Sequence, residues 1–149
     1  MNYLVDTCVI SEYLKKQPTQ KVINWLDAQD ERTLYLSSVT IAELKKGYFK
    51  LVNKEETPEN KHKAKKIRRW IQQLEQRFES RMVGVDAEVL AEWAQLCGQA
   101  EAMGNKLPVV ESLLTATASV HGLIVVTRHI ADFERCDSAL DIFNPFGLG

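Results

Sequence analysis

Apolar residues along this chain follow two different patterns. Short and nearly continuous apolar runs predict buried β-strands, and they lie at 2–6, 34–38, 82–85, 123–127 and 139–145. Longer stretches place apolar residues three and four positions apart, which is the spacing of one helical face, and they lie at 7–16, 19–30, 39–52, 57–81, 86–103 and 109–122. The segment 128–136 predicts a loop followed by one helical turn.

Residues that favour helix ends stand at several of these boundaries. Thr7, Thr19 and Asp86 are placed to accept hydrogen bonds from the first free backbone N–H groups of a helix. Pro58 suits a first helical position because its φ angle is already fixed there. Gly122 follows the last turn of its helix and predicts a stop.

The alternation of buried strands with amphipathic helices predicts an α/β sandwich with a mainly parallel central sheet. Strands that are buried on both faces give continuous apolar runs, and parallel strands need helical connections between them. The chain has 149 residues and no internal repeat or low-complexity linker, so we expect a single domain over 1–149.

Composition narrows the class of protein. The amino terminus lacks the features of a secretory leader, and no segment is long and apolar enough to span a membrane. Three cysteines without CxxC spacing favour neither a disulfide framework nor a zinc site, so we expect a reducing cytoplasm. The formal net charge of −1 does not favour a generally basic nucleic-acid binder, so a polyanion would have to meet a local patch.

Four acidic residues are predicted to meet at one edge of the sheet. Asp6 ends the first strand, Glu43 lies in the first turns after the second strand, Glu111 lies in the first turn of a helix, and Asp132 follows the strand 123–127. In an open parallel sheet, the crevice beyond the carboxyl ends of the strands is the default ligand site. Clustered carboxylates repel each other unless a cation neutralises them, and all-oxygen ligands suit Mg²⁺ or Mn²⁺.

Such an ion points to phosphodiester hydrolysis by a metal-activated water, without a covalent nucleophile. Thr7 and Thr115 are candidates for holding waters or carboxylates in place, and Arg128 is a candidate for contacting a substrate phosphate.

The segments NYLVDTCVISE, SSVTIAELKKG, PVVESLLTATASVHGLIVVTRHIADFER and the terminal IFNPF occur in this order over nearly the whole chain. As a set, they resemble the PIN-domain family, particularly its VapC-like and FitB-like bacterial toxins. The resemblance implies a three-layer α/β/α sandwich, endonucleolytic cleavage of RNA using Mg²⁺ or Mn²⁺, and a cognate antitoxin that blocks the site. It also implies a homodimer within a toxin-antitoxin complex, with transfer RNA as a reasonable substrate.

The resemblance carries over residue by residue. Asp6, Glu43 and Asp132 match acids of the family, and Glu111 matches a position that is usually Asp. Asp6, Glu43 and Glu111 are therefore the expected metal ligands, with Asp132 completing the acidic pocket. His129 is a second departure, at a position that is often Asn.

The substitution at Glu111 leaves an alternative open, namely a catalytically impaired PIN-fold module that retains antitoxin recognition. A phosphatase on a similar sheet is a weaker third hypothesis, because the Asp-x-Asp expected after the first strand is absent.

Each acid also has an ordinary structural explanation. Asp6 can cap a helix, Glu43 can be a solvated helix residue, and Glu111 can interact with the helix dipole. Asp132 can cap the turn before Phe133. Their joint position in the matched segments favours the functional interpretation.

The cations at 61–69 have two open interpretations: a solvated helix face, or a surface for RNA phosphates or an acidic partner segment. The residues are Lys61, Lys63, Lys65, Lys66, Arg68 and Arg69.

Overall fold

A five-stranded parallel sheet lies at the centre of the computed structural model, which describes residues 1–147. Residues 148 and 149 of the expected domain lie outside the described residues. The strand order is β3-β2-β1-β4-β5, and all four pairings are parallel. The strands are β1 (Tyr3–Val5), β2 (Leu34–Ser37), β3 (Met82–Val83), β4 (Ile124–Val126) and β5 (Ile142–Phe143). Every predicted strand is therefore present, although each is shorter than the apolar run that indicated it.

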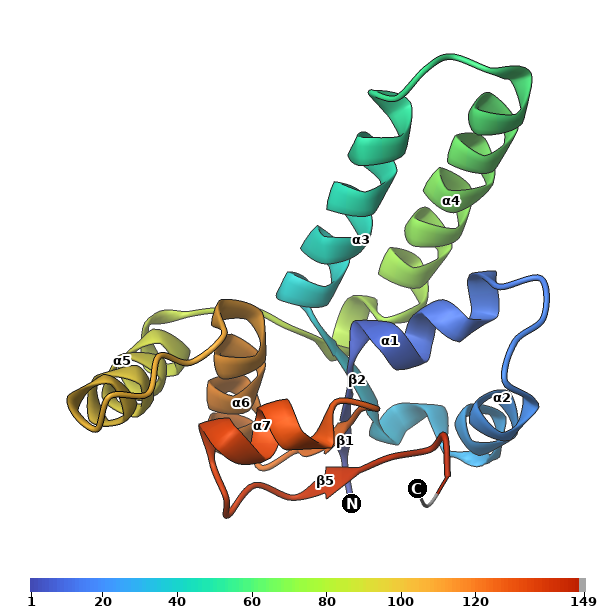
Figure 1. Cartoon of the computed structure of the whole chain (residues 1–149). Coiled ribbons are helices and arrows are strands. Elements are labelled where there is room, and N and C mark those ends of the chain that lie inside the picture. The colour runs from blue at the N-terminus through green and yellow to red at the C-terminus, as the bar shows by residue number, and fades with distance from the viewer. Residues whose placement is uncertain (148–149) are drawn as a thin grey trace.

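Helices connect successive strands, as parallel pairing requires. They are α1 (Thr7–Ile10), α2 (Gln20–Ala28), α3 (Ser38–Val52), α4 (Pro58–Arg77), α5 (Ala87–Ala102), α6 (Val109–His121) and α7 (Ile130–Cys136). In Figure 1, α5, α6 and α7 lie together on one side of the sheet, whereas α2 lies on the other side.

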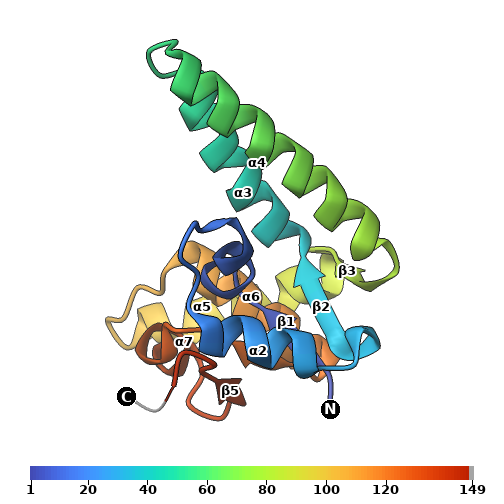
Figure 2. The same cartoon turned by 90° about the vertical axis from the view of Figure 1, so that its right-hand side faces the viewer.

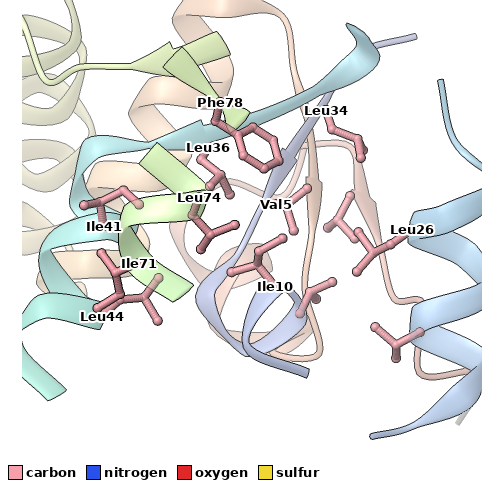
Figure 3. Packing of buried hydrophobic residues seen from close by; sticks show 13 residues of the cluster. Val5, Ile10, Leu26, Leu34, Leu36, Ile41, Leu44, Ile71, Leu74 and Phe78 are labelled. Carbon is pink, nitrogen blue, oxygen red and sulfur yellow. The ribbon is translucent and has the colours of Figure 1, made fainter. Parts of the chain in front are cut away.

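Two hydrophobic cores, one on each face of the sheet, make the molecule a three-layer α/β/α sandwich. Val5 and Val126 pack with residues of α2, α3 and α4, and Figure 3 shows Val5 among these side chains. Leu4 and Val125 point the opposite way and pack with residues of α6 and α7. This alternation follows from the two-residue period of a strand, and it confirms the predicted fold class.

The helices α3 and α4 form a long hairpin that projects from the sheet (Figures 1 and 2). At its base, Ile41 and Leu44 of α3 belong to the same buried cluster as Ile71 and Leu74 of α4 (Figure 3). The apolar stripe predicted for α4 thus packs against α3, and the opposite side of α4 faces solvent.

Several helix boundaries and caps differ from the prediction. Thr19 does precede α2, but its side chain makes no capping hydrogen bond. The helix after β1 is only Thr7–Ile10, followed by a 3-10 turn at Ser11–Leu14. Its cap is Asp6 and not Thr7, because the Asp6 side chain accepts from the Thr7 N–H. The helix α7 has seven residues, about two turns rather than the single turn expected. Asp86 does cap α5, and Gly122 ends α6 with a φ angle of 64°.

Candidate active site

The carboxyl ends of β1 and β4 place Asp6 beside Thr127. Val5 and Val126 are register partners, so the residues that follow them also lie side by side. Asp6 is 7% exposed, yet both of its carboxylate oxygens are hydrogen-bonded. Its Oδ1 accepts from the Thr7 N–H at 2.8 Å, and its Oδ2 accepts from the Thr127 hydroxyl at 2.7 Å. These bonds offset the cost of burying the carboxylate and fix its direction.

The second acid, Glu43, is tied to the same place through Thr7. Glu43 lies in the second turn of α3, which begins directly after β2 and is capped by the buried Ser37 side chain. The Thr7 hydroxyl donates to Glu43 Oε1 at 2.7 Å. Thr7 therefore contacts both carboxylates, one through its backbone N–H and the other through its hydroxyl. Asp6 and Glu43, which are far apart in the sequence, are neighbours in the fold.

Thr127 is a site residue that the sequence reasoning missed. Besides holding Asp6, its hydroxyl oxygen accepts from the His129 N–H at 3.0 Å, which fixes the first residues after β4. A signal was available: the run 123–127 ends in a single hydroxyl, and a parallel neighbour of the first strand would place that hydroxyl next to Asp6. Thr7, which was predicted to support the site, contacts Glu43, and its role there stays a prediction.

The Cys8 thiol borders the Asp6 carboxylate but is not an activated nucleophile. Its Sγ lies 3.5 Å from Asp6 Oδ2 and 3.7 Å from Thr127 Oγ1. Burial, with a further contribution from the charge of Asp6, raises the pKa of the Cys8 thiol to about 11. The thiol is therefore protonated at neutral pH and acts at most as a weak donor.

Glu111 is held differently from the first two acids. It is half-buried in the first turn of α6, and its carboxylate makes no hydrogen bond or ion pair within residues 1–147. Thr115, which was predicted to support the site, donates instead to the main-chain carbonyl of Glu111 at 2.8 Å. Burial raises the pKa of the Cys136 thiol, and the charge of Glu111 contributes to that rise. The Glu111 carboxylate is thus within electrostatic reach of α7.

Asp132 and Arg128 complete the predicted set. Asp132 is half-buried in the first turn of α7, and within the described part of the chain its carboxylate has no partner. Arg128 is exposed, and its guanidinium stacks over the Phe146 ring with 3.8 Å between Cζ and the ring centroid. This stacking leaves the N–H groups at the edge of the guanidinium available to a phosphate.

The donor set fits a hard divalent cation in its chemistry. All four acids offer carboxylate oxygens, and Thr7 and Thr127 orient two of them through hydroxyl hydrogens. Over residues 1–147, however, no three His, Cys, Asp or Glu side chains lie close enough to hold one ion together. The structure therefore brings Asp6 and Glu43 together, but not Glu111 and Asp132 with them.

Comparison with known proteins defines the class to which this site and fold belong. The family model of the PIN domain matches residues 3–137. The chain belongs to the PIN-domain family.

Similarity to individual proteins extends over almost the full chain. It is 36% identical to the toxin FitB of Neisseria gonorrhoeae over 143 residues, covering 96% of this chain and 97% of FitB. It is 34% identical to the VapC ribonuclease Y4jK of Sinorhizobium fredii, covering 96% of each. A crystal structure of FitAcB from Neisseria gonorrhoeae superposes with a TM-score of 0.82 at 31% identity, covering 98% of this chain and 99% of that one.

The described residues contain no helix with the length and apolar character needed to cross a membrane.

Proposed function

We propose that this protein is the toxin of a toxin-antitoxin module and acts as a metal-dependent endoribonuclease. The observation that carries the proposal is the Thr7 link, which joins the buried Asp6 to Glu43 at the carboxyl edge of the sheet. The similarity to a protein named toxin FitB and to a protein named VapC ribonuclease supports it. Hydrolysis of RNA phosphodiester bonds is the reaction that an all-oxygen site of this kind suits best.

Asp6 and Glu43 would hold Mg²⁺ or Mn²⁺, and Glu111 would complete the site after a change of side-chain rotamer. Such an ion, when bound, lowers the pKa of a water and stabilises charge on the reacting phosphate. The residues of the chain then have separate roles. Thr7 and Thr127 keep two carboxylates in fixed directions, Asp132 orients the attacking water, and Arg128 contacts a phosphate of the RNA.

The partner is a cognate antitoxin whose basic side chain reaches the acidic pocket. A guanidinium can neutralise carboxylates as a metal does, and its paired N–H groups match a carboxylate. A toxin homodimer inside a toxin-antitoxin complex, acting in the cytoplasm, completes this proposal. The similarity to a chain of the FitAcB structure supports a protein partner of the antitoxin class.

The test is cleavage of RNA by the purified protein, with transfer RNA as the first substrate. We expect cleavage with added Mg²⁺ or Mn²⁺ and none in excess chelator. Full activity in chelator would contradict a metal mechanism. Full activity of Asp6→Asn would contradict the assigned site.

A catalytically impaired module that retains antitoxin binding is the second candidate. It is favoured by the separation of Glu111 from the Asp6 and Glu43 pair and by the longer side chain at a position that is usually Asp in the family. Comparing the wild type with Glu111→Asp discriminates the two. A large gain of cleavage in the variant supports the impaired module, whereas equal or lower cleavage supports the competent enzyme.

A further inference from the structure

The outer face of α4 carries cations that the candidate active site does not use. Residues 61–69 hold six of the 19 Lys and Arg residues of a chain whose net charge is −1. In a helix of 3.6 residues per turn, four of the basic positions in this segment share the side opposite the buried stripe. We call this set the α4 basic face, and it consists of His62, Lys65, Lys66 and Arg69.

The side chains of the α4 basic face converge. All four are exposed, and together they line one surface hollow. Lys65 and Lys66 each lie one turn before Arg69, a spacing at which like charges destabilise a helix. An acidic residue one turn away would relieve this repulsion. The next two positions on the same face, 73 and 76, are however both Gln.

Two charged residues near the other end of the same helix do form ion pairs. Near its carboxyl end, Arg77 forms an ion pair with Glu31, and Glu75 pairs with Lys45 of α3 at 3.3 Å. By contrast, no member of the α4 basic face has an ion-pair partner within residues 1–147. The unneutralised charge is therefore local to one part of the helix.

The α4 basic face lies on the hairpin that also carries Glu43. Arg68, next to Arg69, lines a groove with Tyr48 of α3, which follows Glu43 by five residues. At 1.5 Å per residue along α3, that separation is about 8 Å. Glu43 lies near the base of the hairpin, whereas the α4 basic face lies on the half of α4 nearer its free end (Figure 1). A long polyanion on the face therefore has to run along the hairpin to reach the carboxylates.

We propose that the α4 basic face binds the phosphate backbone of the RNA that the enzyme cleaves. The choice of RNA rests on the proposed function, whereas the choice of a polyanion rests on the unpaired and convergent charges. The face carries no Phe, Tyr or Trp on which bases could stack, so it contacts the backbone without reading sequence. Binding there positions structured RNA while Asp6 and Glu43 act on another phosphodiester bond of the same molecule.

The test compares two triple variants of equal charge. One is Lys65→Gln with Lys66→Gln and Arg69→Gln on the α4 basic face. The control is Lys16→Gln with Lys21→Gln and Lys106→Gln, three exposed positions outside the hairpin. Fluorescence anisotropy measures binding of a labelled 20-base-pair RNA duplex of mixed sequence in EDTA, where cleavage is not expected.

We expect the α4 variant to bind the duplex about 30- to 100-fold more weakly at 0.1 M salt, and the dependence of log K on log salt to flatten by about 2. The control changes affinity less than about threefold. Thermal unfolding of both variants establishes that they remain folded.

Three results would overturn the inference: no duplex binding by the wild type, equal losses in both variants, or tighter α4-dependent binding of a poly-glutamate peptide. The last would assign the face to an acidic protein segment. Duplex binding through α4 without metal-dependent cleavage would support this inference while contradicting the proposed function.

Discussion

The two halves of the candidate site differ in how their carboxylates are held. Asp6 and Glu43 accept hydrogen bonds from Thr7, and Asp6 also accepts one from Thr127. Glu111 and Asp132, on α6 and α7, have no side-chain partner within the described residues. One half is fixed by the protein alone, whereas the other has carboxylates that the protein does not orient.

This difference shows which part of a metal site the fold itself can build. Asp6 lies where β1 ends, so backbone register places it beside Thr127, and Thr7 then holds the carboxylate of Glu43 on α3. In the second half, no hydrogen bond within the described residues fixes the side-chain rotamers of Glu111 and Asp132. We expect the first half to set affinity for the ion and the second half to adjust to it.

The largest expected effect follows from neutralising the fixed half. Asp6→Asn should lower metal-dependent RNA cleavage by about 1,000-fold, because it removes a ligand charge that the surroundings are arranged to hold. Asn remains a good helix cap, so thermal unfolding should change little. Asp132→Asn should cost less. The comparison would be wrong if Asp132→Asn were the more damaging of the two.

Two threonines, one in each half, provide a matched pair. Thr127→Val removes the hydroxyl that holds Asp6, and we expect a loss of about 10- to 100-fold in Mn²⁺ affinity and cleavage. Thr115→Val removes a hydroxyl that donates only to the carbonyl of Glu111, so its loss should stay below about threefold. Calorimetric Mn²⁺ titration of both variants measures the difference. Equal losses would mean that Thr127 has no special part in the site.

Replacing Thr7 tests whether its contacts to Asp6 and Glu43 contribute to cleavage. Thr7→Val keeps the backbone N–H bond to Asp6 but removes the hydroxyl bond to Glu43, and we expect about a tenfold loss of cleavage. Thr7→Ser keeps both bonds and should restore most of the activity. Initial cleavage rates at saturating Mn²⁺ test this. Failure of the serine variant to recover would assign the loss to packing instead.

The smallest expected effect is on the free energy of unfolding, through the buried Glu12 that follows α1. Glu12 is fully buried after α1, where its Oε1 accepts from the Thr19 N–H at 2.8 Å and its Oε2 pairs with Lys15 at 2.5 Å. Burial raises the pKa of Glu12, but Lys15 and Thr19 more than compensate and bring it below its usual value. Ionised Glu12 therefore stabilises the fold above pH 4.5, and this contribution is lost as the pH falls through the lowered pKa.

Accordingly, Glu12→Gln should lower the free energy of unfolding by about 1 kcal/mol at neutral pH, and by progressively less below pH 4.5. Urea unfolding at several pH values measures this change. Glu134→Gln, at an exposed position, is the control and should have little effect. A penalty for Glu12→Gln that did not shrink in acid would show that the charge is not its source.

The strands and the order of the elements could be predicted from the sequence, because continuous apolar runs and helical stripes are local signals. The first half of the site followed from them. Asp6 follows a strand, and Glu43 lies in the second turn of the crossover helix that follows the next strand. Strand order, which puts Thr127 beside Asp6, depends on pairing between distant segments that local patterns do not encode.

The cap of α1 and the direction of the Glu111 carboxylate were harder to predict, because they depend on backbone angles and side-chain rotamers. Either Asp6 or Thr7 can cap α1, and only the backbone angles decide that Asp6 does so. The helical position of Glu111 was predicted correctly, but its carboxylate direction depends on rotamers and on neighbours such as α7. The resemblance to the family supplied its expected role as a metal ligand, and that role stays a prediction.

Whether Asp6 and Glu43 share one ion can be measured in a crystal of this protein soaked in Mn²⁺, through the anomalous scattering of the ion. We expect a peak contacted by Asp6 and Glu43, with the carboxylate of Glu111 completing the site. A peak bound away from Asp6 and Glu43, or an empty pocket at millimolar Mn²⁺, would contradict this expectation.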